Sequence, residues 1–243
     1  MKPKIYVTYP IGKEVKAYLT EHCEIRQWEG RRGVPEDVLR TELQDVEGLY
    51  TSGSGIKKID EQLLSHAPHL KVVSNVSVGY NNFDVAALQK RNIIGTNTPG
   101  VLDETVADLA FGLILSTARR IVELDRFVKA GFWTNETTYS DTYGKDVHGA
   151  TVGIIGMGRI GEAIAKRAKF GFNMDILYHN RSRKLATEEK YGATYRELNE
   201  LLQEADFVVL MTPLTKETFQ LIGEKEFKLM KKSAVFINMS RGQ

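Results

Sequence analysis

The stretch that decides the fold is Thr151-Val-Gly-Ile-Ile-Gly-Met-Gly-Arg-Ile-Gly161. Its first part, from Val152 to Ile155, is a short apolar run that predicts a buried strand. The run ends in three glycines spaced as G-x-G-x-x-G, and apolar residues then recur at helical spacing as far as Ala168. A strand, a glycine-rich turn and a helix in this order are typical of a unit that binds a dinucleotide through its pyrophosphate.

Each glycine of this turn has its own physical reason. Gly156 permits the tight turn, Gly158 lets the backbone approach a pyrophosphate, and Gly161 allows the helix to pack close to the strand. The amide groups at the start of the helix, around Arg159 and Ile160, offer donors and a partial positive charge to the phosphates. Glycine-rich turns also occur for purely structural reasons. Here a second strand begins shortly after the helix, and that context favours dinucleotide binding.

Composition excludes several classes of function. The 243 residues suffice for one large domain or two smaller ones, and the net charge of +2, with acids and bases interspersed, argues against nucleic acid or an anionic membrane as partner. No apolar run approaches the ~18 residues of a membrane span, and the N-terminus lacks a signal-peptide core. Cys23 is the only cysteine, so we expect no intrachain disulfide and no metal site, and we interpret it as a small apolar residue in a strand. A soluble, cytoplasmic protein is expected.

Strands and helices alternate through the first half of the chain. Strands are predicted at 4–8, 23–28, 48–51, 70–74 and 93–96, and helices at 13–20, 35–43, 60–66 and 84–90. Alternation at this spacing predicts a parallel sheet with helices on both faces. Because this half has no G-x-G-x-x-G of its own, we expect an α/β domain that does not hold the dinucleotide.

The second half begins after a break at 98–100. A single helix is predicted from 103 to about 130, apolar nearly all round between Val106 and Leu115, which suits a helix buried between two domains. The polar stretch 133–144 predicts a surface loop, and further strands are predicted at 175–178, 206–210 and 234–238. The chain stops just after a strand, about one strand short of a six-stranded dinucleotide fold. We therefore expect a C-terminally truncated chain, with a complete five-stranded variant as the alternative.

Ligands of open α/β sheets lie beyond the carboxyl ends of the strands, and four loops qualify. In the loop 75–84, the amides of Val78 and Gly79 could bind a carboxylate. The second loop, 52–55, is rich in glycine, and the third contains Thr212-Pro213. Arg241 follows the last strand, where its guanidinium could grip a carboxylate in bidentate fashion. A lone arginine at this position can equally be a surface residue.

Taken together, these motifs resemble the D-isomer-specific 2-hydroxyacid dehydrogenase family. The resemblance extends in the family's order over essentially the whole chain. Its motifs are Ser77-Val-Gly-Tyr-Asn-Asn-Phe-Asp84, Asn97-Thr-Pro-Gly100 with Glu104-Thr105, Arg119-Arg120, Gly153-Ile-Ile-Gly-Met-Gly-Arg-Ile-Gly161, Thr212-Pro-Leu214 and Asn238-Met-Ser-Arg-Gly242. Within the family the chain looks closest to the glyoxylate/hydroxypyruvate reductase and 2-ketogluconate reductase branch.

The resemblance implies a flavodoxin-like substrate domain at 1–99 and a Rossmann coenzyme domain at 100–243, acting on a small 2-oxo or 2-hydroxy acid. By the same resemblance, Val78, Gly79 and Ser54 bind the substrate, and Thr105 contacts the nicotinamide side of the coenzyme. Arg241 corresponds to the catalytic arginine, which binds the 2-oxo acid and polarises its carbonyl. The remaining coenzyme contacts are Gly156, Gly158, Arg159, Ile160, Gly161, Thr212 and Pro213. A homodimer through the helix from Asp103 and the loop near Trp133 is also implied.

One departure from the family pattern concerns the general acid. The family uses a histidine paired with a carboxylate, and both lie beyond the catalytic arginine, whereas this chain ends two residues after Arg241. None of the five histidines is a convincing substitute; each is interpreted as structural or solvated. Loss of a general acid commonly costs ~10²–10⁴-fold in rate. We therefore expect the 243 residues alone to be inactive or nearly so, and the intact protein to be a reductase.

The residues after the second strand of the dinucleotide unit bear on the choice of coenzyme. An NAD site usually carries Asp or Glu there to bind the ribose 2′-hydroxyl, but this strand ends in the neutral Asn180. Arg181-Ser182-Arg183-Lys184 follows, and it offers bidentate guanidinium and a hydroxyl to an adenosine 2′-phosphate. The alternative is a solvated basic loop. We predict that NADP(H) is preferred and that NAD(H) is possible.

Two other functions stay open. Corepressors of the C-terminal-binding-protein type resemble the same family and use the dinucleotide as a signal, although no partner-docking extension is visible here and Arg241 is retained. Within the enzyme class, phosphoglycerate and formate dehydrogenases are alternatives. The basic loop argues mildly against both, since those relatives commonly use NAD.

Overall fold

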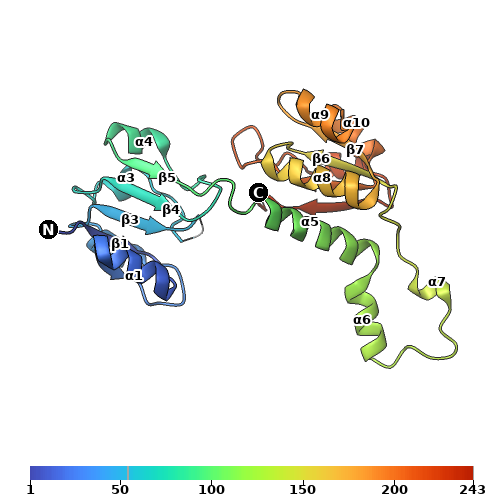
Figure 1. Ribbon diagram of the computed structural model, residues 1–243, viewed down its shortest axis with the longest axis horizontal. Coiled ribbons are helices and arrows are strands. Elements are labelled where there is room, and N and C mark those ends of the chain that lie inside the picture. The colour runs from blue at the N-terminus through green and yellow to red at the C-terminus, as the bar shows by residue number, and fades with distance from the viewer. Residues whose placement is uncertain (54, 243) are drawn as a thin grey trace. The chain divides into compact units, whose positions relative to one another are not determined.

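The computed structural model describes residues 1–53 and 55–242. The chain forms two compact units, Met1–Val101 and Leu102–Gln243. Each unit contains one five-stranded sheet whose strand pairs are all parallel, with helices packed against it (Figure 1). The predicted α/β class with two doubly wound sheets is therefore confirmed.

The first unit has the strand order β2-β1-β3-β4-β5, which is the flavodoxin-like order. Its elements are β1 (Lys4–Val7), α1 (Lys13–His22), β2 (Glu24–Gln27), α2 (Glu36–Glu42), β3 (Gly48–Thr51), α3 (Glu61–Leu64), β4 (Val72–Asn75), α4 (Val85–Lys90) and β5 (Ile94–Thr96). Leu43, Leu64 and Val73 are fully or almost fully buried in the core beside α2, α3 and α4. The placement of Cys23 in a strand is wrong, because its amide still bonds back to Leu19 and so ends α1.

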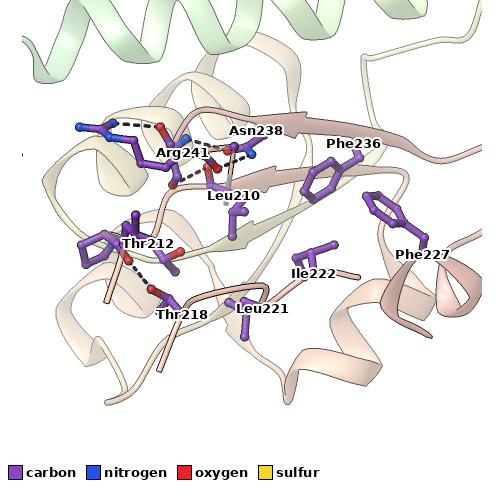
Figure 2. Close-up of a pocket in the computed structure, with 13 residues that line it drawn as sticks. Leu210, Thr212, Thr218, Leu221, Ile222, Phe227, Phe236, Asn238 and Arg241 are labelled. Atoms are coloured by element: carbon purple, nitrogen blue, oxygen red, sulfur yellow. Dashed lines mark hydrogen bonds between the residues drawn. The ribbon is translucent and has the colours of Figure 1, made fainter. Parts of the chain in front are cut away.

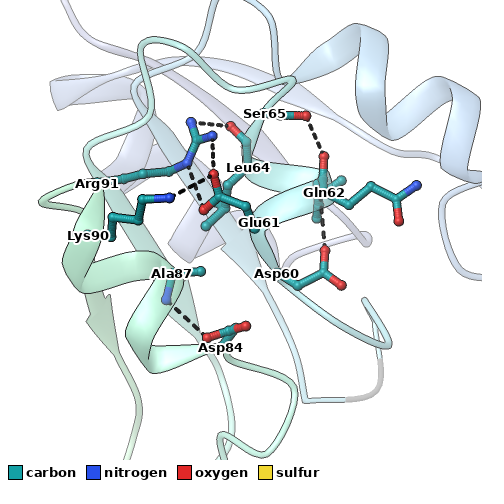
Figure 3. Close-up of polar contacts among 10 residues, drawn as sticks. Asp60, Glu61, Gln62, Leu64, Ser65, Asp84, Ala87, Lys90 and Arg91 are labelled. Atoms are coloured by element: carbon teal, nitrogen blue, oxygen red, sulfur yellow. Dashed lines mark hydrogen bonds and ion pairs between the residues drawn. The ribbon is translucent and has the colours of Figure 1, made fainter.

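Two short helices of this unit are fixed at both ends by polar side chains. Asp60 and Asp84 cap the starts of α3 and α4, and each carboxylate accepts a hydrogen bond from the amide three residues on, at 3.1 and 3.0 Å. Just after α4, Arg91 donates to Glu61 at 2.8 Å and to the carbonyl of Leu64 at 3.0 Å (Figure 3). The two helices are thus joined to each other and packed on the sheet as a pair.

The second unit has the order β10-β9-β6-β7-β8, so that its first strand, β6, lies in the middle, as in the Rossmann fold. Its elements are α5 (Asp103–Ala118), α6 (Ile121–Lys129), α7 (Tyr139–Thr142), β6 (Thr151–Ile155), α8 (Arg159–Phe172), β7 (Asp175–His179), α9 (Leu185–Tyr191), β8 (Thr194–Tyr195), α10 (Leu198–Glu204), β9 (Phe207–Leu210), α11 (Glu224–Leu229) and β10 (Val235–Asn238). The sequence analysis did not predict β8 or the helices α7, α9, α10 and α11. Of these, β8 and α7 are too short to show a periodic pattern.

Helices α5 and α8 pack together on one face of the second sheet, while α10 covers the other. Phe111 of α5 stacks on Phe172 at the end of α8, with 5.0 Å between ring centroids. Arg167 of α8 reaches across to α5, where it donates to the Glu104 carboxylate at 2.7 Å and to Asp108 at 2.5 Å. These contacts fix the start of α5 beside the glycine-rich turn.

The prediction of one helix from 103 to about 130 is wrong. Arg120 adopts a left-handed conformation with φ of 54°, which separates α5 from α6. The cause is a distant part of the chain, since the amide of Lys145 takes the carbonyl of Ala118 at 2.7 Å and leaves the next turn of helix without that acceptor. The expected burial all round is also wrong, because α5 packs through one face only and Leu109 is 56% exposed in the single chain.

Within the residues that the structure describes, no helix is long and apolar enough to cross a membrane. In the same residues, no three side chains of His, Cys, Asp or Glu gather in a way that could hold a metal ion.

Candidate functional site

The turn between β6 and α8 can be built only from glycine at its first position. Gly156 has φ of +105°, a conformation that side-chain-bearing residues rarely adopt. A Cβ at this position would lie 2.9 Å from the carbonyl carbon of Met211, so the turn also sits directly against the end of β9. Its amide donates to the carbonyl of His179 at 2.9 Å, which joins the turn to β7 as well.

The other two glycines have opposite surroundings. A Cβ on Gly161 would lie 2.5 Å from the carbonyl oxygen of Gly156, so its absence lets α8 pack against the turn. Around Gly158 nothing lies within 4 Å of where a Cβ would stand, so the turn is open on that side. Gly158 is the N-cap of α8, and the amides of Arg159 and Ile160 belong to the first turn, where helical amides have no acceptor within the helix. An open turn of this polarity fits a pyrophosphate.

The start of α5 lies next to this turn. Arg159 donates to Asp103 at 3.2 Å, and the second carboxylate oxygen of Asp103 is buried with no hydrogen-bond partner among the described residues. Thr105, predicted to face the nicotinamide, is exposed in the same first turn of α5. The structure thus brings Thr105 and the glycine-rich turn into one region of the second unit.

A pocket of about 180 Å³ lies at the carboxyl ends of β9 and β10 (Figure 2). It contains three of the predicted residues, Thr212, Pro213 and Arg241, and none of the three glycines. Its wall is largely apolar on the side away from Arg241, where Figure 2 shows Phe227 and Phe236 packed edge to face. The pocket borders the glycine-rich turn through Thr212, whose amide nitrogen lies 3.1 Å from where a Cβ of Gly156 would stand.

The backbone that carries Arg241 is shaped by the side chain of Asn238. The Asn238 amide group donates to the carbonyl of Arg241 at 2.8 Å, and its oxygen accepts from the amide of Ser240 at 2.9 Å. The Ser240 hydroxyl also donates to the carbonyl of Leu210 at 3.2 Å, which joins this turn to the end of β9. Arg241 itself is exposed, and its guanidinium donates to the carbonyl of Ser240 at 3.0 Å.

The loop between β7 and α9 places its three cations in different environments. Asn180 donates to the carbonyl of Ser182 at 2.9 Å, which curls the loop. Arg181 is exposed and forms no hydrogen bond or ion pair within the described part of the chain. Arg183 forms a bidentate pair with Glu188 at 3.0 and 2.5 Å. The sequence analysis missed Glu188, which lies five residues after Arg183 at the start of the next helix.

In the first unit, the loop after β4 is held by its carbonyl groups. Asn97 donates to the carbonyl of Val78 at 2.8 Å, and the carbonyl of Gly79 accepts from Asn75 at 3.0 Å and from Ser77 at 2.6 Å. Because a peptide unit is planar, holding the Val78 carbonyl also fixes the Gly79 amide. The Val78 amide shares its plane with the Ser77 carbonyl, which accepts from the Thr98 amide at 3.0 Å. The amides of Val78 and Gly79 donate to no acceptor among the described residues, as a carboxylate-binding loop requires.

Sequence reasoning missed the polar residues that support these loops. Asn97 lies nineteen residues beyond the carbonyl it binds, so only the tertiary fold joins it to the loop. Asn75 is buried at the start of the loop itself, four residues before Gly79, and only its supporting role was missed. The predicted substrate contact Ser54 lies outside the described residues. His179, one of the histidines interpreted as structural, has its Nδ1 within 3.0 Å of the carbonyl of Arg196.

Comparison with known proteins assigns the family. Residues 111–243 match the model of the D-isomer specific 2-hydroxyacid dehydrogenase, NAD binding domain. The whole chain is 46% identical to a glyoxylate reductase of Thermococcus gammatolerans, of which it spans 73%. It is 48% identical to a glyoxylate/hydroxypyruvate reductase B of an Enterobacter species, of which it spans 74%.

A solved structure agrees in fold. The TT0316 protein of Thermus thermophilus superposes with a TM-score of 0.89 at 36% identity, over 98% of this chain and 74% of the other. The open glycine turn, the Rossmann strand order and these matches lead to one conclusion: the chain belongs to the D-isomer specific 2-hydroxyacid dehydrogenase family and carries its NAD-binding domain.

Proposed function

We propose that the protein reduces a small 2-oxo acid, of the glyoxylate, hydroxypyruvate or 2-ketogluconate type, to the D-2-hydroxy acid, with NADPH preferred over NADH. The observation that carries the proposal is the open turn at Gly158 in a chain 46–48% identical to proteins named glyoxylate reductase and glyoxylate/hydroxypyruvate reductase. When bound there, the nicotinamide coenzyme supplies the hydride that the carbonyl carbon of the 2-oxo acid accepts.

Each unit contributes a different part of this chemistry. The amides of Val78 and Gly79 bind the substrate carboxylate. Asn97 fixes the Gly79 amide through the Val78 carbonyl, and the Thr98 amide fixes the Val78 amide through the Ser77 carbonyl. The Arg241 guanidinium binds the 2-oxo acid and stabilises the negative charge that develops on the carbonyl oxygen, an effect typically worth ~3–4 kcal/mol for one such donor. Thr105 contacts the nicotinamide side of the coenzyme.

The reaction is tested with the full-length protein. Oxidation of NADPH, followed by its absorbance, is expected with glyoxylate, hydroxypyruvate or 2-ketogluconate, and the product of a prochiral substrate should be the D isomer. A protein that binds the coenzyme tightly but turns over none of the three acids would contradict the proposal. That result would favour a dinucleotide-sensing function instead.

The preference for NADPH rests on the β7–α9 loop. No carboxylate follows β7 directly, since Asn180 stands there. Arg181 and Ser182 are exposed in the same loop, and a guanidinium and a hydroxyl suit an adenosine 2′-phosphate, which supports the proposal. Arg181→Ala should lower the affinity for NADPH about tenfold and leave the affinity for NADH unchanged, because a charge-assisted hydrogen bond contributes ~1.5–3 kcal/mol. The control is Lys190→Ala, an exposed cation on α9, and equal losses for both coenzymes would contradict the assignment.

We also propose that the protein is a cytoplasmic homodimer. The support for the dimer is a group of exposed apolar side chains on α5, α6 and the segment that follows, namely Leu109, Leu113, Ile121, Val122, Phe132 and Trp133. Apolar surface of this extent commonly marks an interface. Light scattering of the purified full-length protein should give twice the monomer mass, and a monomer at micromolar concentration would contradict it.

A further inference from the structure

A buried tyrosine and a carboxylate together hold one arginine of the β7–α9 loop. The Tyr178 side chain is fully buried, and its hydroxyl donates to Glu188 Oε1 at 2.5 Å while it accepts from the amide of Lys184 at 2.8 Å. Glu188 in turn accepts from Arg183, whose Nε lies 3.0 Å from Oε1 and whose Nη2 lies 2.5 Å from Oε2. We call these three side chains, Tyr178, Glu188 and Arg183, the clasp.

Charge and burial keep the clasp closed at neutral pH. The Glu188 side chain is only 17% exposed, and its contacts with Arg183 and Tyr178 hold the pKa of the carboxyl below its usual range. Glu188 also raises the pKa of the Arg183 guanidinium, so both partners remain charged. Two of the donor nitrogens of Arg183 are used by this pair, and bidentate pairing fixes the plane of the guanidinium.

Arg181, only two residues away, is in the opposite state. It is exposed, and it contributes, after Thr215 and Lys216, to lowering the pKa of the Glu217 carboxyl in the loop after β9. The β7–α9 loop therefore carries one arginine, Arg181, whose guanidinium is available to a ligand. Its second arginine, Arg183, is already paired with Glu188. The sequence alone presents the two as equivalent.

We propose that Glu188 is a specificity-determining residue. By holding Arg183 through the clasp, it withholds a second guanidinium from the adenosine 2′-phosphate, and so limits the preference for NADPH and preserves use of NADH. This inference rests on the proposed function, in which Arg181 and Ser182 meet the 2′-phosphate. Glu188 touches neither the substrate nor the nicotinamide, and it acts on coenzyme choice through Arg183.

The opposing interpretation is that the clasp only shapes the loop. Glu188→Gln separates the two, because glutamine keeps the size of the side chain and an oxygen that can accept from Tyr178, but it loses the charge that retains Arg183. If the loop lost its shape, the binding of NADPH and of NADH would weaken together. Release of Arg183 would strengthen only the coenzyme that carries a 2′-phosphate.

The experiment measures direct binding of NADPH and NADH to the full-length protein. Glu188→Gln should bind NADPH about tenfold more tightly, as one added charge-assisted contact allows, with NADH unchanged. Glu189→Gln, an exposed neighbour on the same helix, is the matched control and should change neither affinity. The double variant Arg183→Ala with Glu188→Gln should lose the gain, which assigns it to Arg183.

Arg183→Ala alone tests the same idea without touching Glu188, and thus covers a Glu188 variant that fails to fold. Because Arg183 is already occupied, this variant should weaken NADPH much less than Arg181→Ala does. Equal losses from the two arginine variants, or a Glu188→Gln protein that binds NADPH no better than the Glu189→Gln control, would overturn the inference alone. A wild-type protein with no preference between the coenzymes would overturn the proposed coenzyme choice and this inference with it.

Discussion

The first strand of each unit runs to the carboxyl edge of a parallel sheet and turns into a helix, but the two turns differ. In the second unit, the turn after β6 has a positive φ at Gly156 and is open at Gly158, and α8 buries five residues. In the first unit, the turn after β1 contains Tyr9, which is half-buried against Tyr50, and α1 buries none. Burial, followed by the contact with Tyr50, raises the pKa of the Tyr9 hydroxyl well above its usual value.

The difference teaches that the doubly wound fold does not by itself make a coenzyme site. What the second unit adds is the removal of Cβ atoms at three positions, which brings a helix N-terminus close to the strand and leaves space above it. In the first unit Tyr9 lies in the corresponding turn, and we propose that the loop after β4 binds the substrate instead.

The largest effect on stability and on NADPH binding is expected from Gly156→Ala. The added Cβ would meet the Met211 carbonyl at 2.9 Å and force an alanine to φ of +105°, so we expect a loss of about 2–4 kcal/mol in unfolding free energy and no NADPH binding. Gly12→Ala in the first unit is the control, since its φ is −59° and its Cβ would meet nothing within 4 Å. Denaturant unfolding measures the stability of both variants, and equal stability would show that position 156 accepts an alanine without strain.

Gly158→Ala should separate binding from folding. A Cβ here meets no protein atom within 4 Å and the φ of −89° suits alanine, so the unfolding free energy should stay unchanged. The methyl group would instead occupy the space assigned to the pyrophosphate, and NADPH affinity should fall at least about tenfold. Calorimetric titration of NADPH gives the affinity; unaltered binding would remove the pyrophosphate from this position.

The first unit is tested through Asn97→Ala. Without this side chain the Val78 carbonyl is no longer held at 2.8 Å, and the adjoining Gly79 amide loses its fixed direction. We expect KM for the 2-oxo acid to rise about fivefold, as loss of one neutral hydrogen bond allows, while KM for NADPH is unchanged. Gln89→Ala, exposed on α4, serves as control. A matching rise in both KM values would mean that Asn97 acts on the fold as a whole.

The smallest effect concerns a carboxylate before a strand in each unit. Burial raises the pKa of Asp206, but the Thr151 amide and the ammonium groups of Lys231 and Lys145 together lower it below the usual value. Its stabilising contribution is therefore present above the unfolded-state pKa of about 3.9 and is lost as the pH falls through the lower folded pKa.

We expect Asp206→Asn to lose about 1 kcal/mol of unfolding free energy at pH 7, with the difference from wild type shrinking below pH ~4. Glu47 of the first unit pairs with Lys71 at the surface, so Glu47→Gln should have a smaller effect. The midpoints of urea unfolding at pH 7 and pH 3, measured for wild type and both variants, test these expectations. A difference for Asp206→Asn that stays constant down to pH 3 would contradict the assigned pKa direction.

The sequence predicted the arrangement of strands well, because strand and turn signals are local. The glycine spacing located β6, and the regular alternation of the first half predicted a parallel sheet. It failed at Arg120, where no proline or glycine marks the break. The left-handed residue there follows from a contact with Lys145, twenty-five positions away, and no local pattern carries that information.

Prediction of the site divides along the same line. The position of the glycine-rich turn could be predicted because it follows from a short motif, and the role proposed for Arg181 rests on the same kind of local pattern. Asn97 and Glu188 could not, since each acts on a loop from another element and shows its role only when the fold brings it there. Arg183 is an example: the sequence shows it as a free cation of a basic loop, whereas the structure pairs it with Glu188.

The contact between Lys145 and Ala118 also has a consequence for how this protein can be altered. The chain leaves α5 at Ala118 and returns to the same carbonyl at Lys145, where Gly144 fits because a Cβ would lie 2.3 Å from that oxygen. Residues 119–144 thus form an excursion from the core of the second unit, and its two ends meet at Ala118 and Lys145. Changing its length should leave the core of the second unit folded, at a loop-entropy cost of roughly 0.6 kcal/mol per doubling of length. It should disturb the proposed dimer, because Ile121, Phe132 and Trp133 of that interface lie on this segment.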